Sequence, residues 1–208
     1  MSQLIYLSRH GIVKINTENI PSTAPDAYDL LEEGVKECRN LGEYLSTCHI
    51  SNPFFVDSSL PRTVASTHLV AESMGINLTQ DNYLSCSNFE EDVPREVLSP
   101  EQKEYYCSRH RNRPIKLAQE LGAEVHQELC RIGKVFSENN LIAILHGGIN
   151  LGLIAYLTGQ LKWMHNCGLY VLERTEDRLR VVSDYISVER MRKELESGRI
   201  KLVEQALR

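Results

Sequence analysis

Three short apolar runs, each followed at once by polar or charged residues, set the strongest limit on the fold. They cover residues 4–7, 54–56 and 141–145. Continuous apolar runs of this length are typical of strands that are buried on both faces of a parallel sheet. Ligands of open α/β sheets bind beyond the carboxyl ends of such strands. The sequence therefore predicts an α/β fold whose functional groups gather at one edge of the sheet.

The first run ends in Arg9, His10 and Gly11. An arginine suits a phosphate or a carboxylate, because its planar fork makes two parallel charged hydrogen bonds. Histidine acts as a nucleophile or as an acid and base near neutral pH. Glycine permits a tight turn and lets a ligand approach the backbone. An ordinary surface turn also explains this tripeptide, so the functional interpretation depends on the other two runs.

The other two runs end in similar residue types. Pro61 suits the first turn of a helix over residues 60–74, which places Arg62 at the helix N-terminus, where anions are favoured. His146 ends the third run, and Gly147 opens a further helix whose backbone an anion can approach closely. Taken alone, Arg62 would be an ordinary surface arginine, and only the three strand ends together favour an anion site.

The length, net charge and cysteine pattern of the chain exclude several classes of protein. A chain of 208 residues suits a single domain over 1–208. Its net charge of −5 argues against general nucleic-acid binding. No stretch approaches the roughly 20 apolar residues that span a bilayer, and no signal pattern precedes the first strand, so we expect a cytoplasmic protein without a membrane partner. The six cysteines lack zinc spacing and are expected to be free core thiols.

The remaining pattern predicts helices, a hairpin and an insertion. Asp29 is expected to cap a helix over residues 29–46, and a long amphipathic helix is expected over 115–136. Residues 169–173 and 179–184 are expected to pair as a hairpin. The segment 81–114 contains few apolar residues and is expected to lie as a cap over the edge of the sheet.

In the order of its motifs the chain resembles the histidine phosphatase superfamily, in the branch with phosphoglycerate mutase-like phosphatases. The resemblance is carried by Arg-His-Gly at 9–11, Ser-x-x-x-Arg at 58–62 and His-Gly-Gly at 146–148. It implies a three-layer α/β/α sandwich with a mainly parallel sheet. It also implies that the cap insertion, at about 81–114, covers the active site and selects the substrate.

The resemblance implies the hydrolysis of a small phosphorylated metabolite without a metal or other cofactor. His10 would be the nucleophile and form a phosphohistidine, while Arg9, Arg62 and His146 would surround the phosphoryl group. Gly11 and Gly147 would line the phosphate site, and Asn16, which also suits an ordinary turn, would contact the phosphate. A homodimer is one option for its assembly.

One position departs from the family pattern. The family's proton donor follows a strand as Leu-x-Glu, but this chain has Cys86 in place of the glutamate. A shifted loop would let Glu90 take its place, followed in preference by Asp92 and then Glu91. A solvated acidic turn explains the same three residues. No acidic residue follows His146 either, so the superfamily's other donor position is also empty.

Three alternatives to a small-molecule phosphatase stay open. A phosphoglycerate mutase normally has Glu-Ser after Arg-His-Gly, whereas this chain has Ile12 and Val13. A phosphate-binding or scaffold protein that has lost efficient turnover is consistent with Cys86. A phosphoprotein phosphatase would use a basic cluster, otherwise a solvated turn, to recognise an acidic peptide; this cluster comprises Arg109, Arg111 and Arg113.

Overall fold

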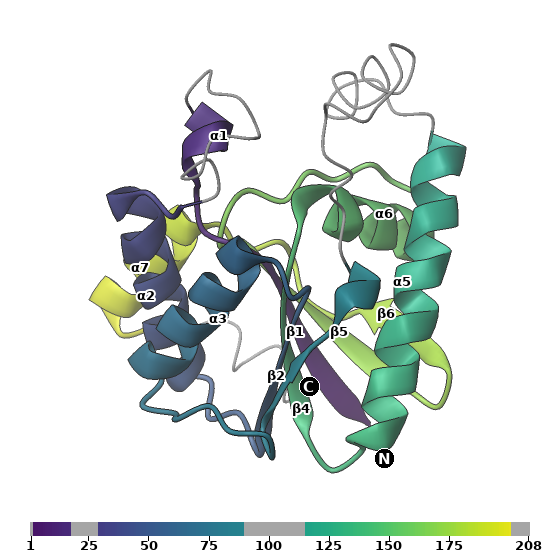
Figure 1. Cartoon of the computed structure of the whole chain (residues 1–208), viewed down its shortest axis with the longest axis horizontal. Coiled ribbons are helices and arrows are strands. Elements are labelled where there is room, and N and C mark those ends of the chain that lie inside the picture. The colour runs from purple at the N-terminus through teal and green to yellow at the C-terminus, as the bar shows by residue number, and fades with distance from the viewer. Residues whose placement is uncertain (1, 18–28, 90–114, 201–208) are drawn as a thin grey trace.

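A mixed sheet forms the centre of the computed structural model, which describes residues 2–17, 29–89 and 115–200 (Figure 1). Within these residues the sheet has six strands in the order β3-β2-β4-β1-β5-β6. The first four are parallel to one another, β5 runs antiparallel to β1, and β6 runs antiparallel to β5. The strands are β1 (Gln3–Arg9), β2 (Pro53–Asp57), β3 (Tyr83–Ser85), β4 (Asn140–Leu145), β5 (Leu169–Thr175) and β6 (Arg178–Val181).

Helices cover both faces of the sheet and make the three predicted layers. One face carries α2 (Glu32–Ser46), α3 (Pro61–Ser73) and α7 (Val188–Ser197), and the other carries α5 (Ile115–Val135) and α6 (Gly147–Thr158) (Figure 1). This double covering explains why the strand runs are continuously apolar. No helix in the described parts of the chain combines the length and apolarity needed to cross a bilayer.

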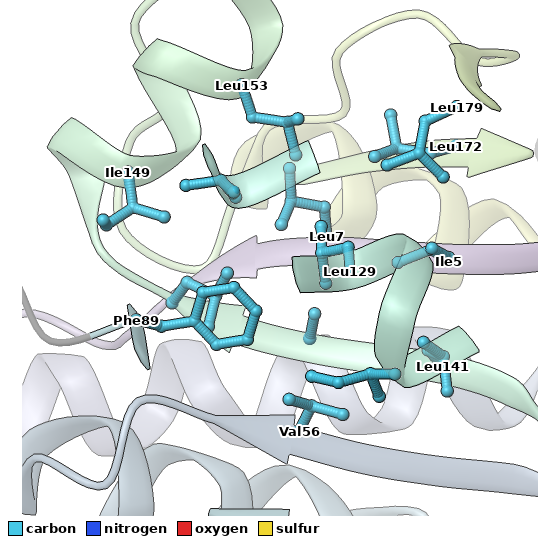
Figure 2. Close-up of a cluster of buried hydrophobic side chains, with 14 of the residues drawn as sticks. Ile5, Leu7, Val56, Phe89, Leu129, Leu141, Ile149, Leu153, Leu172 and Leu179 are labelled. Atoms are coloured by element: carbon cyan, nitrogen blue, oxygen red, sulfur yellow. The ribbon is translucent and has the colours of Figure 1, made fainter. Parts of the chain in front are cut away.

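The central strands contribute to two separate cores because successive side chains point to opposite faces of a strand. Ile5 and Leu7 of β1 pack on the α5 and α6 side, whereas Tyr6 packs on the α2 and α3 side. Figure 2 shows the first of these cores, in which Leu129 of α5 and Leu153 of α6 pack over the strands. The buried strands therefore give the edge of the sheet a rigid support on both sides.

The predicted helix over residues 29–46 begins later than expected. Helix α2 starts at Glu32, and its N-cap Leu31 offers no side-chain cap, so the prediction that Asp29 caps this helix is wrong. The Asp29 carbonyl accepts a hydrogen bond from the Lys14 backbone N–H, and Leu30 forms a β-bridge with Val13. These pairings hold residues 29 and 30 in an extended conformation. The predicted hairpin is confirmed as β5 and β6.

Helices α5 and α6 approach closely through two glycines. A Cβ on Gly122 would overlap the backbone carbonyl of Gly152, and a Cβ on Gly152 would lie 2.9 Å from the Ala118 carbonyl oxygen. Because the two helices pack closely at these glycines, α6 lies against both α5 and the sheet. The start of α6, where His146 lies, is thereby held in place.

We expect Gly122→Ala to lower the free energy of unfolding by about 1 kcal/mol or more. The added methyl group would overlap the Gly152 carbonyl oxygen, so we expect a cost near the upper end of the range of about 1–3 kcal/mol for overpacking, against a gain in helix propensity of about 1 kcal/mol. Chemical denaturation measures the difference. The matched control, Glu120→Ala on the exposed face of the same helix, should change stability by less than about 0.5 kcal/mol. Equal stability of the two variants would contradict the proposed close packing.

Candidate active site

His10 lies directly beyond β1, at the carboxyl edge of the parallel strands. Its backbone N–H donates to the Leu145 carbonyl of β4 at 3.0 Å, and its side chain is only 3% exposed. The ring atom Nδ1 lies 2.7 Å from the Gly11 carbonyl oxygen. Because a carbonyl oxygen only accepts, Nδ1 carries the proton and Nε2 keeps its lone pair. Nε2 therefore has the free lone pair that a nucleophile or a base requires.

The charge state of His10 is set by its surroundings. Burial lowers its pKa well below the usual value, and the positive charges of Arg9 and Arg62 lower it further. The hydrogen bond to Gly11 acts in the opposite direction. A neutral imidazole near two guanidinium groups is suited to attack an anion that those groups attract.

The turn after His10 has no room for a side chain. A Cβ on Gly11 would lie 2.7 Å from the Gly34 carbonyl oxygen and 2.8 Å from Cys38 Sγ. The Gly11 N–H donates to Ser66 Oγ of α3 at 3.0 Å. Helices α2 and α3 thus fix the backbone that carries His10, and this is the physical reason for glycine at position 11.

Arg62 and His146 form the second half of the site through a directed hydrogen-bond chain. The Arg62 guanidinium donates to His146 Nδ1 at 3.1 Å, so the ring proton lies on Nε2, which donates to Ser58 Oγ at 2.5 Å. The Ser58 hydroxyl then donates to Thr63 Oγ1 at 2.9 Å, because the Thr63 hydroxyl donates to the Leu60 carbonyl at 2.8 Å. Burial and then Arg62 lower the pKa of His146 well below its usual value.

The two histidine rings lie edge to face, with centroids 5.4 Å apart and planes inclined by 62°. Their proximity follows from the pairing of β1 with β4, in which Arg9 lies opposite Leu145. Arg62 is 6% exposed and His146 is 1% exposed. Neutral rings beside two guanidinium groups give this pocket edge the positive potential that an anion requires.

The loop between α6 and β5 also contacts Arg9 and His10. The Arg9 guanidinium carbon lies 5.1 Å from the centre of the Trp163 ring. The Arg9 carbonyl accepts from the Cys167 N–H at 2.9 Å, and the His10 carbonyl accepts from Asn166 Nδ2 at 2.8 Å. Sequence reasoning missed these loop residues. The only signal was that the single tryptophan of the chain lies in a polar loop.

The structure brings six of the predicted site residues together: Arg9, His10, Gly11, Arg62, His146 and Gly147. A Cβ on Gly147 would lie 3.1 Å from Arg9 Nε. Both ring nitrogens of His146 already have protein partners. Sequence reasoning also missed Ser58 as a partner of His146, although it stood in the motif.

Asn16 is exposed and closes a local turn, where its Oδ1 accepts from the Val13 N–H at 3.2 Å. The candidate donors and basic cluster of residues 90–114 lie outside the described residues; these are Glu90, Glu91, Asp92, Arg109, Arg111 and Arg113. Among the described residues, no three histidine, cysteine, aspartate or glutamate side chains are grouped so that they could hold a metal ion.

Cys86, at the position of the expected acid, is 8% exposed. Its thiol donates to Glu128 Oε1 of α5 at 3.4 Å, and burial raises its pKa. Hydrogen bonds, chiefly from Arg131, lower the pKa of Glu128 to about 2. The thiol is therefore neutral and bound to a carboxylate, so Cys86 is a poor proton donor.

We expect Ser58→Ala to lower the free energy of unfolding by about 1–3 kcal/mol, because the buried Nε2–H of His146 loses its acceptor. Chemical denaturation measures this loss. The control, Ser46→Ala, removes an exposed serine hydroxyl from the end of α2 and should cost less than about 0.5 kcal/mol. A Ser58→Ala variant as stable as the control would contradict the expected contribution of this buried hydrogen bond to stability.

Solved structures of known proteins share this fold. The chain resembles the solved phosphoglycerate mutase of Bacillus anthracis str. Sterne, with TM-score 0.62, 17% identity and coverage of 100% of this chain and 97% of that chain. A putative alpha-ribazole-5'-P phosphatase from Escherichia coli gives TM-score 0.63, 17% identity and coverage of 89% and 98%. A mutant phosphoserine phosphatase from Entamoeba histolytica, solved in complex with phosphoserine, gives TM-score 0.63, 12% identity and coverage of 90% and 98%.

At these identities the solved structures show the fold alone. No match was found among curated protein sequences. The profile of the histidine phosphatase superfamily (branch 1), however, matches residues 5–186, which contain all three strand ends of the site. The chain therefore belongs to the histidine phosphatase superfamily, branch 1.

Proposed function

We propose that this protein hydrolyses the phosphomonoester of a small metabolite through a phosphohistidine on His10. One observation carries the proposal. The neutral ring of His10 lies 5.4 Å from that of His146, and Arg62 donates to His146 at 3.1 Å, all buried at the carboxyl edge of the sheet. This is a nucleophile beside an anion-binding group. Membership of a superfamily of phosphatases and mutases supports the reaction class.

In the proposed reaction His10 Nε2 attacks phosphorus, and the bond from phosphorus to the leaving oxygen breaks. The Gly11 carbonyl, which already holds Nδ1–H, stabilises the positive charge that develops on the ring. Arg9 and Arg62 stabilise the negative charge of the phosphoryl oxygens, which is the main task in phosphoryl transfer. They take the place of a metal ion. Water then attacks the phosphohistidine and releases phosphate.

Phosphate binding should change the partners of His146. A phosphate oxygen is a stronger acceptor for the Arg62 N–H than a ring nitrogen, because the oxygen is charged. When it replaces His146 Nδ1 as acceptor, that nitrogen is free to take a proton and to donate to the phosphate itself. The ring would then be held between the phosphate and Ser58, which is 2.5 Å away before binding.

A carboxylic acid must protonate the leaving alcohol, and we assign this role first to Glu90, then to Asp92 and Glu91. Cys86 is excluded as donor by its raised pKa and by its bond to Glu128. The absence of Glu-Ser after Arg-His-Gly favours a phosphatase over a mutase. The solved structures named for phosphoserine and alpha-ribazole-5'-P phosphatases support a small phosphorylated substrate, although a phosphoglycerate mutase shares the fold.

A second candidate, a phosphate-binding protein without efficient turnover, rests on Cys86. If no acid replaces the family's glutamate, esters of poorly acidic alcohols would bind but would not react, because their leaving oxygen needs a proton. Aryl phosphates need little protonation of the leaving group. Their hydrolysis therefore reports the nucleophile and the arginines even where the acid is missing.

We expect His10→Ala to lower the hydrolysis of an aryl phosphate by at least roughly 1,000-fold, because the attacking atom is removed. A steady-state assay measures this, and circular dichroism checks the fold. The control His68→Ala removes an exposed histidine of α3 and should leave the rate unchanged. Retained turnover in His10→Ala would overturn the phosphohistidine route. Bound phosphate with no turnover in the wild type would favour the binding protein.

The pH profile should show a nucleophile that stays neutral in mild acid. Since burial and the two arginines lower the pKa of His10, protonation is delayed to a pH below the usual imidazole value of about 6.5. We expect kcat/KM for an aryl phosphate to hold through pH 6.5 and to fall only at lower pH, in assays over about pH 4.5–8.5. An NMR titration of the His10 ring separates its protonation from that of the substrate. A midpoint at or above about 6.5 for His10 would contradict the assignment.

A further inference from the structure

Two buried cysteine side chains meet beneath the turn that carries His10. Cys38 Sγ of α2 lies 3.5 Å from Cys167 Sγ, in the loop before β5, and the two residues are 0% and 1% exposed. The cysteines at two other described positions have different partners: Cys86 donates to Glu128, and Cys48 to the Tyr44 carbonyl. A disulfide has a sulfur separation of about 2.05 Å, so the pair needs an approach of only about 1.5 Å.

This thiol pair adjoins both residues that flank His10. Cys38 Sγ lies where a side chain on Gly11 would collide with it, and the Cys167 N–H donates to the Arg9 carbonyl. Cys167 also has φ of 50°, a left-handed conformation that is uncommon for a residue other than glycine. A change at either sulfur would therefore be transmitted directly to the backbone of the proposed nucleophile.

We propose that Cys38 and Cys167 are a redox-active pair that closes to a reversible intramolecular disulfide when hydrogen peroxide reaches it. The pair is a modification site distinct from the phosphate pocket. Formation of the disulfide does not depend on the proposed function; only its expected effect on turnover does.

The two sulfurs have different roles in this oxidation. The hydrogen bond between the two thiols, with further ones from Ser66 and the Gly11 backbone, lowers the pKa of Cys38, whereas burial raises the pKa of Cys167 well above its usual value. Cys38 is thus the sulfur that ionises and attacks first, since the thiolate is the reactive form.

The chemistry balances with one peroxide. The Cys38 thiolate attacks a peroxide oxygen, the O–O bond breaks, and the hydroxide that leaves takes up the Cys38 proton and becomes water. Cys167 sulfur then attacks the sulfenic acid on Cys38, the S–O bond breaks, and the Cys167 proton leaves with that oxygen as a second water. The two thiols supply the two electrons that reduce the peroxide.

Burial makes this reaction selective. Bulky oxidants have no contact with residues that are 0% and 1% exposed, so hydrogen peroxide, and later dithiothreitol, must enter during a local opening of the loop. Once Cys38 is a sulfenic acid, the Cys167 thiol is 3.5 Å away, and no closer thiol is present among the described residues. Oxidation should accordingly be slow but should end in one disulfide.

The test treats the reduced full chain with hydrogen peroxide, alkylates the remaining thiols, and digests the protein without reductant. We expect mass spectrometry to find the peptides of Cys38 and Cys167 linked, and dithiothreitol to separate them. The same samples are assayed with an aryl phosphate. Turnover should fall roughly tenfold to 100-fold and should return on reduction, as expected when a nucleophile is misplaced by about 1 Å.

Matched variants locate the effect. Cys38→Ala should form no linkage at Cys167 and should keep its activity in peroxide. Cys48→Ala, which leaves the pair intact, should behave as the wild type. If Cys38→Ala does not fold, the disulfide linkage in the wild type still tests the proposal, because mass spectrometry detects it without the variant.

Two outcomes overturn the proposal: both cysteines recovered as alkylated or over-oxidised residues without a mutual linkage, or either one linked to a different cysteine such as Cys107. The peptide linkage is read independently of turnover. A linked protein that has no phosphatase activity when reduced would therefore reject the proposed function and keep the disulfide.

Discussion

The parallel pairing of β1 with β4 is the constraint on which the site depends. Its register sets Arg9 opposite Leu145, so the next residue of each strand, His10 and His146, leaves the sheet at the same level. The hydrogen bond from the His10 N–H to the Leu145 carbonyl extends this ladder by one step. A shift of one residue would turn a histidine to the opposite face. Backbone pairing, more than any side-chain contact, therefore sets the distance between the two rings.

Burial determines the protonation states of the two histidine rings. Two guanidinium groups stay charged at any physiological pH, and a buried imidazole beside them is more stable neutral than charged. Hydrogen-bond partners choose the tautomers, since the Gly11 carbonyl requires a proton on His10 Nδ1 and the Arg62 N–H requires a lone pair on His146 Nδ1. These protonation states and charges suit the anion of the proposed reaction, which would then need little reorganisation of the site.

Local sequence signals were sufficient for the α/β fold and for the residues at the strand ends, and the family resemblance implied the three layers. Continuous apolar runs predicted the buried strands, and Pro61 predicted the start of α3, because both signals are local. Asp29 was assigned wrongly because its backbone pairs with Lys14, fifteen positions earlier in the chain. Three contacts around the site could not be predicted: that of Ser58 with His146, that of Asn166 with the His10 carbonyl, and that of Cys38 with Cys167. They depend on segments that meet only in the folded chain and that no spacing links.

The central place of β1 has a consequence for biosynthesis. Its partner strands β4 and β5 begin at Asn140 and Leu169, so β1 leaves the ribosome long before either neighbour exists. At about 5–20 residues per second, the 135 positions between His10 and Leu145 take roughly 7–27 seconds to translate. During that time the apolar residues 4–7 have no sheet to join. The nascent chain therefore passes through an aggregation-prone interval, in which a chaperone that shields its first strand would raise the yield of folded protein.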